Sequence, residues 1–177
     1  ETIDDYRDVA GRNEYEYQKK NGGDLKKLLE DMKLGSRDNG RTPFQWDDTK
    51  NAGYTTGEPW LKVNPNYKTL NAAAQEKDPN SALNYFRKVV ALRKNNKVLV
   101  YGKYSLVDEQ NPEIYAYTRE LEGKKMLILL NFSQKNASTV TDKKLGKLLI
   151  NNYPTVQKVS GNKIVLRPYE ARVYEVK

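Results

Sequence analysis

The spacing of apolar residues changes near residue 97, and that change limits how the chain can fold. Over residues 81–97, apolar side chains recur at the three- and four-residue intervals of an amphipathic helix. Over residues 98–177, short apolar runs are instead separated by turn signals such as Glu122-Gly123. We therefore expect an α+β chain, with helices first and an antiparallel β-sandwich over residues 98–177.

Several segments of the second half have the composition expected of strands. Their first residues are Val98, Ile114, Lys125, Lys147, Lys163 and Ala171. Short strands at this spacing, with turns between them, are typical of an antiparallel sandwich.

Residues 1–34 predict two further helices. The sequence Asn21-Gly22-Gly23 interrupts the helical pattern, because glycine is unfavourable inside a helix. The second helix restarts at Asp24, a residue type that caps helix N-termini by accepting a backbone hydrogen bond. Its apolar residues follow at helical spacing: Leu25, Leu28, Leu29 and Met32.

Residues 35–80 lack a clear period and are rich in glycine and proline, as linkers are. The same segment holds both tryptophans of the chain, Trp46 and Trp60. Because linkers rarely contain such residues, we interpret 35–80 as an ordered functional loop. We expect both indoles to be buried against neighbouring structure, and stacking on sugar rings is the alternative.

The chain contains no cysteine and no histidine. Disulfides, thiolate nucleophiles, the Ser-His-Asp triad and the usual zinc sites are therefore excluded. Any acid–base chemistry would fall to Asp, Glu, Lys or Tyr. We expect no metal site and no cofactor.

The formal net charge is +8, from 31 Lys and Arg against 23 Asp and Glu. The lysines are dispersed among acidic residues, which indicates a solvated surface, so we expect no nucleic-acid partner. The longest apolar stretch, Met126–Leu130, is too short to span a membrane, so we expect no membrane partner. The sequence begins at Glu1 without an initiator methionine or a signal segment, which indicates a processed, cut or partial chain. We expect a cytoplasmic location.

Residues 36–47, with the sequence SRDNGRTPFQWD, resemble a signature of the α-glucosidase branch of glycoside hydrolase family thirteen, within the α-amylase superfamily. That branch contains oligo-1,6-glucosidases, dextran glucosidases, sucrose isomerases and trehalulose synthases. Further segments that resemble the family follow in its order: Asn51–Tyr54, Pro59–Tyr67, Asn71–Gln75, Ser81–Asn95 and Pro168–Ala171. The resemblance covers essentially the whole chain.

The resemblance implies a (β/α)8 barrel followed by a small antiparallel β domain. A barrel alone takes roughly 250 residues, which this chain does not have. On the family layout, residues 1–97 form the C-terminal end of the catalytic barrel, including the active-site loop 35–80. Residues 98–177 then form the β-sandwich domain.

The resemblance also implies which chemistry is missing. The family uses an Asp nucleophile, a Glu general acid and a second Asp that holds the sugar, and glycoside cleavage needs such a pair of reacting carboxylates. All three lie on earlier barrel strands, and their motifs, one of which contains a histidine, are absent. We therefore expect a C-terminal portion of a retaining α-glucosidase that acts on short gluco-oligosaccharides, with the rest of its parent chain as partner. The portion itself would have no catalytic residue and no activity.

Arg37 is the first candidate for a substrate-binding residue, because the resemblance implies an arginine here that reaches the glucose at the closed end of the pocket. A planar guanidinium suits vicinal sugar hydroxyls. The alternative is an arginine that only braces the loop through Asp38 or Asp47. Asp38 is a second candidate, although an Asx residue before Gly40 also suits a turn. Arg41 is a third candidate, and pairing with a carboxylate is its alternative role.

A carbohydrate-binding or purely structural module is the alternative reading of the whole chain. Residues 98–177 alone would fit such a module. The loop and helices that precede them do not, because a stand-alone sandwich has no need of a barrel-type loop.

Overall fold

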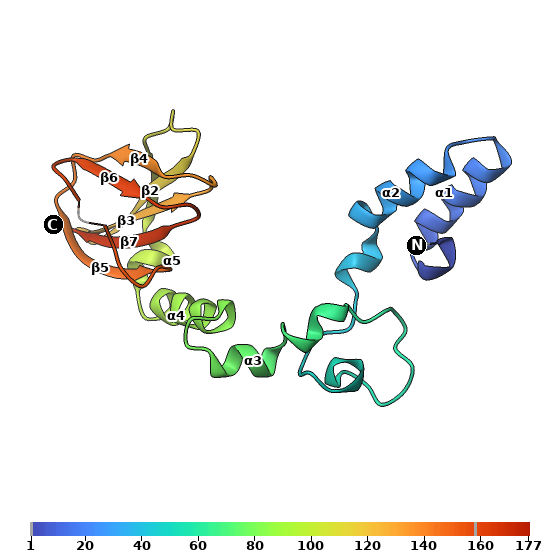
Figure 1. The fold of residues 1–177 in the computed structure, drawn as a ribbon. Coiled ribbons are helices and arrows are strands. Elements are labelled where there is room, and N and C mark those ends of the chain that lie inside the picture. Colours follow the sequence, from blue (N-terminus) through green and yellow to red (C-terminus); the bar gives the residue numbers. More distant parts are fainter. Residues whose placement is uncertain (1, 158) are drawn as a thin grey trace. The chain divides into compact units, whose positions relative to one another are not determined.

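The chain divides into two compact units, Glu1–Asn84 and Tyr85–Lys177, in a computed structural model (Figure 1) that describes residues 2–157 and 159–177. The first unit is helical, and the second consists mainly of β-strands. The predicted order of helices followed by an antiparallel β domain is therefore confirmed.

The first unit contains short helices joined by turns. Its elements are η1 (Ile3–Asp5), α1 (Val9–Lys20), α2 (Leu25–Gly35), η2 (Arg37–Gly40), η3 (Lys50–Gly53), η4 (Pro65–Lys68) and α3 (Ala72–Lys77), where η denotes a 3₁₀ helix. The expected start of the second helix is confirmed, because the Asp24 carboxylate accepts a hydrogen bond from the Lys27 amide at 2.9 Å. Gly22 adopts a φ of 72° in the preceding turn, a conformation that favours glycine.

Backbone hydrogen bonds connect distant parts of the loop 35–80. The amide of Trp46 donates to the carbonyl oxygen of Ala52 at 2.9 Å, and the amide of Ala73 donates to that of Trp46 at 2.9 Å. Asn51 and Ala52 both have positive φ, and the side chain of Ala52 is fully buried. The segment is therefore ordered, as the two tryptophans indicate.

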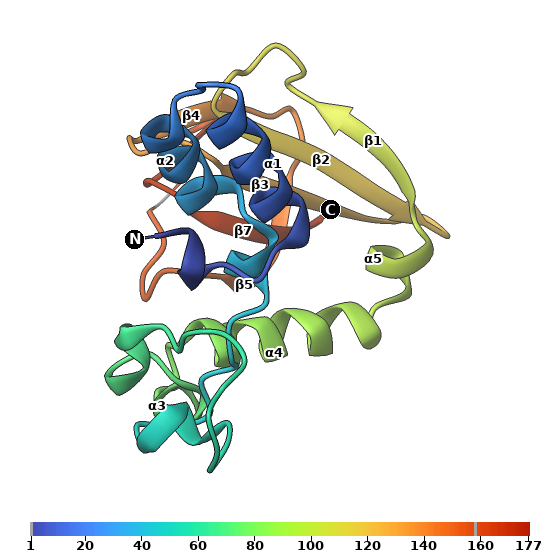
Figure 2. The ribbon, with the colours of Figure 1, turned by 90° about the vertical axis from the view of Figure 1, so that its right-hand side faces the viewer.

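Helix α4 (Ala82–Lys94) begins in the first unit and continues in the second. It is followed by α5 (Lys97–Tyr101), so the strand predicted to begin at Val98 is wrong. Asn96 caps this short helix by accepting a hydrogen bond from the Val98 amide at 3.1 Å. Val98 is buried against Met126 and Ile128, so tertiary packing outweighs its preference for strands. Figure 2 shows the chain passing from α4 through α5 into the next element, β1.

The second unit is a sandwich of two antiparallel sheets. The larger sheet has the order β1 (Lys103–Val107), β2 (Ile114–Leu121), β3 (Lys124–Asn131), β7 (Ala171–Val176) and β5 (Leu145–Asn151). The smaller sheet pairs β4 (Ala137–Val140) with β6 (Lys163–Leu166). Strands β1 and β4 are absent from the sequence-based prediction. The Glu122-Gly123 turn joins β2 to β3 as predicted, and both of its residues have positive φ.

Strand β3 is apolar on both faces because both faces are covered. Leu127 and Leu129 pack with Ile164 and Leu166 of β6, in the core between the two sheets. Met126 and Ile128 point to the opposite face, where they pack against α5. This double burial explains why Met126–Leu130 is the longest apolar run of the chain.

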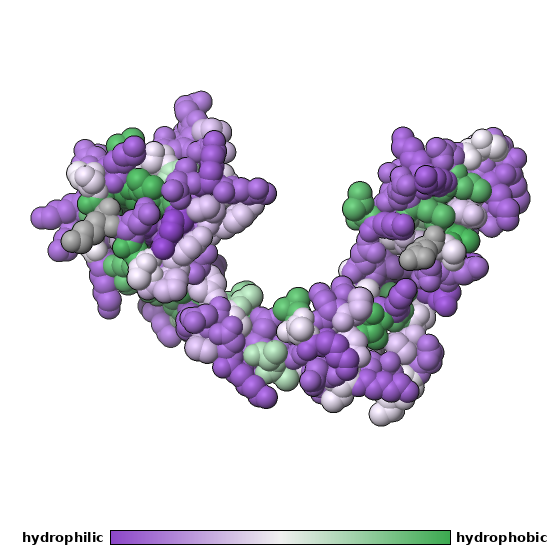
Figure 3. Space-filling view, viewed as in Figure 1, coloured by the Kyte–Doolittle hydropathy of each residue, from purple (hydrophilic) through white to green (hydrophobic). Residues whose placement is uncertain are grey.

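Hydrophilic residues dominate the face of each unit that Figure 3 shows. Within the described residues, every helix is too short or too polar to cross a membrane.

Candidate functional site

Asp38 lies at the start of the candidate loop and links it to the start of α1. Its Oδ2 accepts hydrogen bonds from the backbone amides of Arg7, at 2.6 Å, and Asp8, at 2.9 Å. Its Oδ1 is buried and accepts no hydrogen bond from any described residue. Ser36 caps the 3₁₀ helix η2 and accepts from the Asp38 amide at 3.3 Å, which holds this carboxylate in place.

Arg37 forms an ion pair with Asp8. Its Nη2 and Nε donate to a single oxygen, Oδ1 of Asp8, at 2.9 and 3.2 Å. The Arg37 side chain remains 60% exposed, whereas that of Asp8 is only 9% exposed. The hydrogen bond from Arg37 lowers the pKa of the Asp8 carboxyl, so the pair stays charged near neutral pH.

The bracing partner of Arg37 is thus Asp8, and neither Asp38 nor Asp47 takes that role. Asp47 instead accepts hydrogen bonds from the amide and hydroxyl of Thr49. Sequence reasoning overlooked Asp8, although it directly precedes α1 and caps it through the Ala10 amide at 3.3 Å. An Asp before a helical segment is the signal that indicates this cap.

Arg41, the third candidate, lies just after η2. Its backbone amide donates to the Asp38 carbonyl at 2.9 Å. Its side chain is exposed and forms no ion pair with any described residue. The structure therefore places Arg37, Asp38 and Arg41 on one short turn, with Arg37 and Arg41 exposed and the Asp38 carboxylate buried.

The two tryptophans are exposed within the described chain, at 56% for Trp46 and 62% for Trp60, so the expected burial is not seen. Trp46 packs edge-on against Phe44, with ring centroids 4.6 Å apart. The side-chain amide of Gln45 donates to the carbonyl oxygen of Leu70, and this bond connects the Phe44–Trp46 segment to the residues that follow η4.

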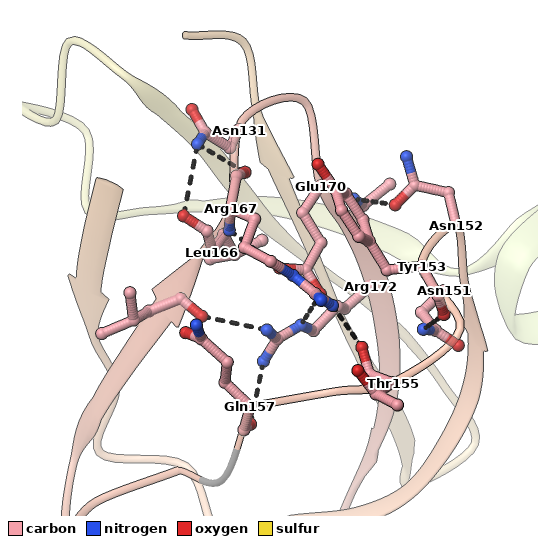
Figure 4. A network of polar contacts seen from close by, with 12 residues as sticks. Asn131, Asn151, Asn152, Tyr153, Thr155, Gln157, Leu166, Arg167, Glu170 and Arg172 are labelled. Carbon is pink, nitrogen blue, oxygen red and sulfur yellow. Dashed lines mark hydrogen bonds and ion pairs between the residues drawn. The ribbon is translucent and has the colours of Figure 1, made fainter. Parts of the chain in front are cut away.

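A second polar cluster lies at one end of the sandwich, and sequence reasoning overlooked it (Figure 4). Glu170 and Arg172 are fully buried, and Arg167 also donates to the Glu170 carboxylate. Burial by itself raises the pKa of the Glu170 carboxyl, but hydrogen bonds from the two arginines outweigh that effect and lower the pKa to about 2. At the same end of the sandwich, the side-chain amide of Asn131 donates hydrogen bonds to backbone carbonyls, including that of Arg167 at 2.8 Å. These partners connect strand ends, which indicates a structural role.

Within residues 2–157 and 159–177, no group of three or more His, Cys, Asp or Glu side chains is placed to hold a metal ion.

Comparison with known families decides where the chain belongs. A family model described as "Alpha amylase, catalytic domain" matches residues 6–102, which is more than half of the chain. The chain belongs to the α-amylase family. A second model, described as "Alpha-amylase SusG C-terminal domain", matches residues 114–173 of this α-amylase family member.

The family's oligo-1,6-glucosidase and sucrose isomerase branch is also supported by individual relatives. The chain is 43% identical over 181 residues to the oligo-1,6-glucosidase of Parageobacillus thermoglucosidasius, which covers 99% of this chain and 32% of that protein. It superposes on the trehalulose synthase MutB of Pseudomonas mesoacidophila MX-45 with a TM-score of 0.92 and 37% identity, over 100% of this chain and 33% of that one. The chain therefore spans about a third of the length of its relatives. Variants of MutB have been solved in complex with the substrate sucrose and with glucose, so homologues bind these sugars.

Proposed function

We propose that this chain is the C-terminal portion of a retaining α-glucosidase that hydrolyses, or transfers glucose from, short α-glucosides such as isomalto- or malto-oligosaccharides. Its similarity to an oligo-1,6-glucosidase over 99% of its residues supports the substrate class. The proposal concerns the whole parent protein, because the chain spans about a third of the relatives' length. A cytoplasmic location remains a prediction.

In this proposal residues 1–97 complete the catalytic barrel, and residues 98–177 form the appended β domain. The compact units divide after Asn84, inside α4, so the exact boundary is open to test. The loop 35–80 supplies one wall of the substrate pocket, with Arg37, Asp38 and Arg41 as the residues nearest the sugar.

The orientation and the exposure of the Arg37 side chain are the observations that support the proposal. Asp8 holds its Nε and Nη2, so the guanidinium is oriented before a ligand arrives, yet the side chain is 60% exposed. Nη1 donates to none of the described residues and is available to hydroxyls of a sugar. An anchored and exposed fork of donors suits vicinal hydroxyls better than a mobile one, because less side-chain entropy is lost on binding.

The chemistry itself would come from the rest of the parent chain. Retaining glycosidases place a nucleophilic carboxylate and an acid carboxyl about 5 to 5.5 Å apart on either side of the scissile bond. We assign neither role to a residue of this chain, and we propose that the chain alone is inactive.

A chimera tests whether this chain can complete an α-glucosidase and whether Arg37 contributes to its activity. The corresponding third of the Parageobacillus oligo-1,6-glucosidase would be replaced by this chain, and isomaltose hydrolysis would be measured. We expect an active chimera in which Arg37→Met lowers kcat/KM at least 10-fold, a loss of about 1.4 kcal/mol of transition-state stabilisation. The matched control Lys50→Met removes an exposed charge from the same loop and should leave the rate unchanged. A folded chimera that Arg37→Met does not affect would remove Arg37 from the site.

A titration of the isolated chain distinguishes the alternative module. We expect no saturable binding of isomaltose or maltose by the 177-residue chain, because the remaining walls of the pocket are contributed elsewhere. Saturable binding would instead favour a carbohydrate-binding module.

A further inference from the structure

A groove of about 370 Å³ opens within the second unit, between residues 85–93 of α4 and the face of the larger sheet that the smaller sheet leaves uncovered. Its walls are mainly apolar, with Val89 on the helix and Leu130 and Val173 on the strands. Its volume lies within the range of small-molecule pockets. This groove has no part in the proposed glucosidase site.

Two arginines line this groove, and no carboxylate does. Arg93, from α4, donates through Nη1 to the carbonyl oxygen of Leu99. Arg119, from β2, donates through Nη2 to the carbonyl oxygen of Val100 at 2.9 Å. In the described part of the chain, neither guanidinium pairs with Asp or Glu, so the groove carries two positive charges that no acidic side chain compensates.

The Nε of Arg119 shows that hydrogen-bond acceptors are scarce beside this side chain. This N–H is buried and has no hydrogen-bond acceptor among the described residues. A buried donor without a partner costs stability, and the cost is larger for a charged group. Because this N–H is itself buried, an acceptor that enters the groove would bond to the other N–H groups of Arg119.

We propose that this groove binds a small molecule with an apolar body and one carboxylate group. The apolar body would contact Val89, Leu130 and Val173, where it leaves water. The carboxylate would accept from Arg119 and Arg93, whose planar donors match the two oxygens of a carboxylate. Burial raises the pKa of the Tyr85 phenol at the same groove, which therefore stays protonated and can donate as well.

A purely structural role for the arginines makes a different prediction. Both guanidiniums bond to carbonyls in the last turn of α5, where a helix has unsatisfied acceptors and a partial negative charge. That role uses one N–H of each arginine and does not account for the absence of a carboxylate from the lining of the groove. It predicts that no carboxylate binds in the groove.

Titration of the isotope-labelled 177-residue chain with octanoate, followed by amide chemical shifts, tests the proposal. We expect saturable shifts confined to α4 and the facing strands, and at least 10-fold weaker binding of 1-octanol, which has the same chain length without the carboxylate. Shifts located elsewhere, no saturation, or equal affinity for the alcohol would overturn the proposal.

Variants separate the contribution of the charge from that of the cavity. Arg119→Met should lower octanoate affinity at least 10-fold and leave the weak octanol binding unchanged. Val173→Trp should fill the groove and abolish both. Lys147→Met removes one positive charge from an exposed site on β5 and should change neither. If Arg119→Met does not fold, Arg93→Met takes its place, and retention of full octanoate affinity in a folded arginine variant contradicts the proposal.

Discussion

Arg172 and Glu170 form an ion pair in which both side chains are fully buried, with Arg172 Nε donating to Glu170 Oε1 at 2.8 Å. Arg172 also donates to the carbonyl oxygen of Val165 on β6 at 3.0 Å. It pairs in register with Leu129 on β3, so its side chain points into the space between the two sheets. A charged pair therefore occupies one end of an otherwise apolar core.

Replacing Arg172 by Met should destabilise the second unit strongly. The substitution leaves Glu170 buried beside Arg167 alone, and breaking a buried pair in this way costs about 3–5 kcal/mol. The loss would be measured by urea unfolding of the 177-residue chain. Lys135→Met serves as the control, because it removes one partner of a partly exposed pair with Glu113 and should cost about 1 kcal/mol or less. Equal effects of the two substitutions would contradict the importance of the buried pair.

The same pair predicts how stability depends on pH. The folded pKa of Glu170 is about 2, below its ordinary value of 4.5, so its contribution is fully present above pH 4.5 and is lost as the pH falls toward 2. A shift of this size corresponds to up to about 3 kcal/mol. Unfolding free energies measured at several pH values between 6 and 2 should fall more steeply for the wild type than for Glu170→Gln. Parallel curves would show that Glu170 does not contribute to acid sensitivity.

Substitution of Asp8 by Ala should loosen the candidate site through Arg37. It removes the N-cap of α1, at a cost of about 1 kcal/mol, and it frees Arg37 Nε and Nη2. Asp24→Ala is the matched control, since it removes the cap of α2 and leaves Arg37 anchored. In the chimera with oligo-1,6-glucosidase, only Asp8→Ala should lower kcat/KM for isomaltose. If both variants lower it equally, the effect comes from helix stability.

Gly53→Ala should destabilise the loop 35–80. Gly53 has a φ of 66°, and a methyl group there would lie 2.7 Å from both carboxylate oxygens of Asp47. The left-handed conformation alone costs roughly 1–2 kcal/mol for a residue with a Cβ. Thermal unfolding of Gly53→Ala, compared with Gly40→Ala, measures the effect. Gly40 has open space around its Cβ position, so its variant should unfold within about 0.5 kcal/mol of the wild type.

The features that the sequence predicts well depend on interactions within a few residues. Asp24 caps its helix through an amide three residues later, and Glu122-Gly123 turns the chain because its conformation suits adjacent antiparallel strands. The match of residues 36–47 to a family signature is likewise a property of a contiguous segment.

The features that the sequence does not predict depend on contacts between distant residues. Val98 lies in a helix because Met126 and Ile128 bury it, although a run of β-branched and aliphatic residues indicates a strand. The partner of Arg37 is 29 residues away, at the start of another helix, and nothing in the spacing of charged residues singles out Asp8 among the acids of the first unit.

From the sequence alone it follows that helices precede an antiparallel β domain and that the chain belongs to the α-amylase family. The packing of distant segments sets which charges pair, which of them are buried and where a groove opens beside Arg93 and Arg119. Hydrogen-bond caps and turns are local interactions, whereas burial and ion pairing depend on how separate segments pack.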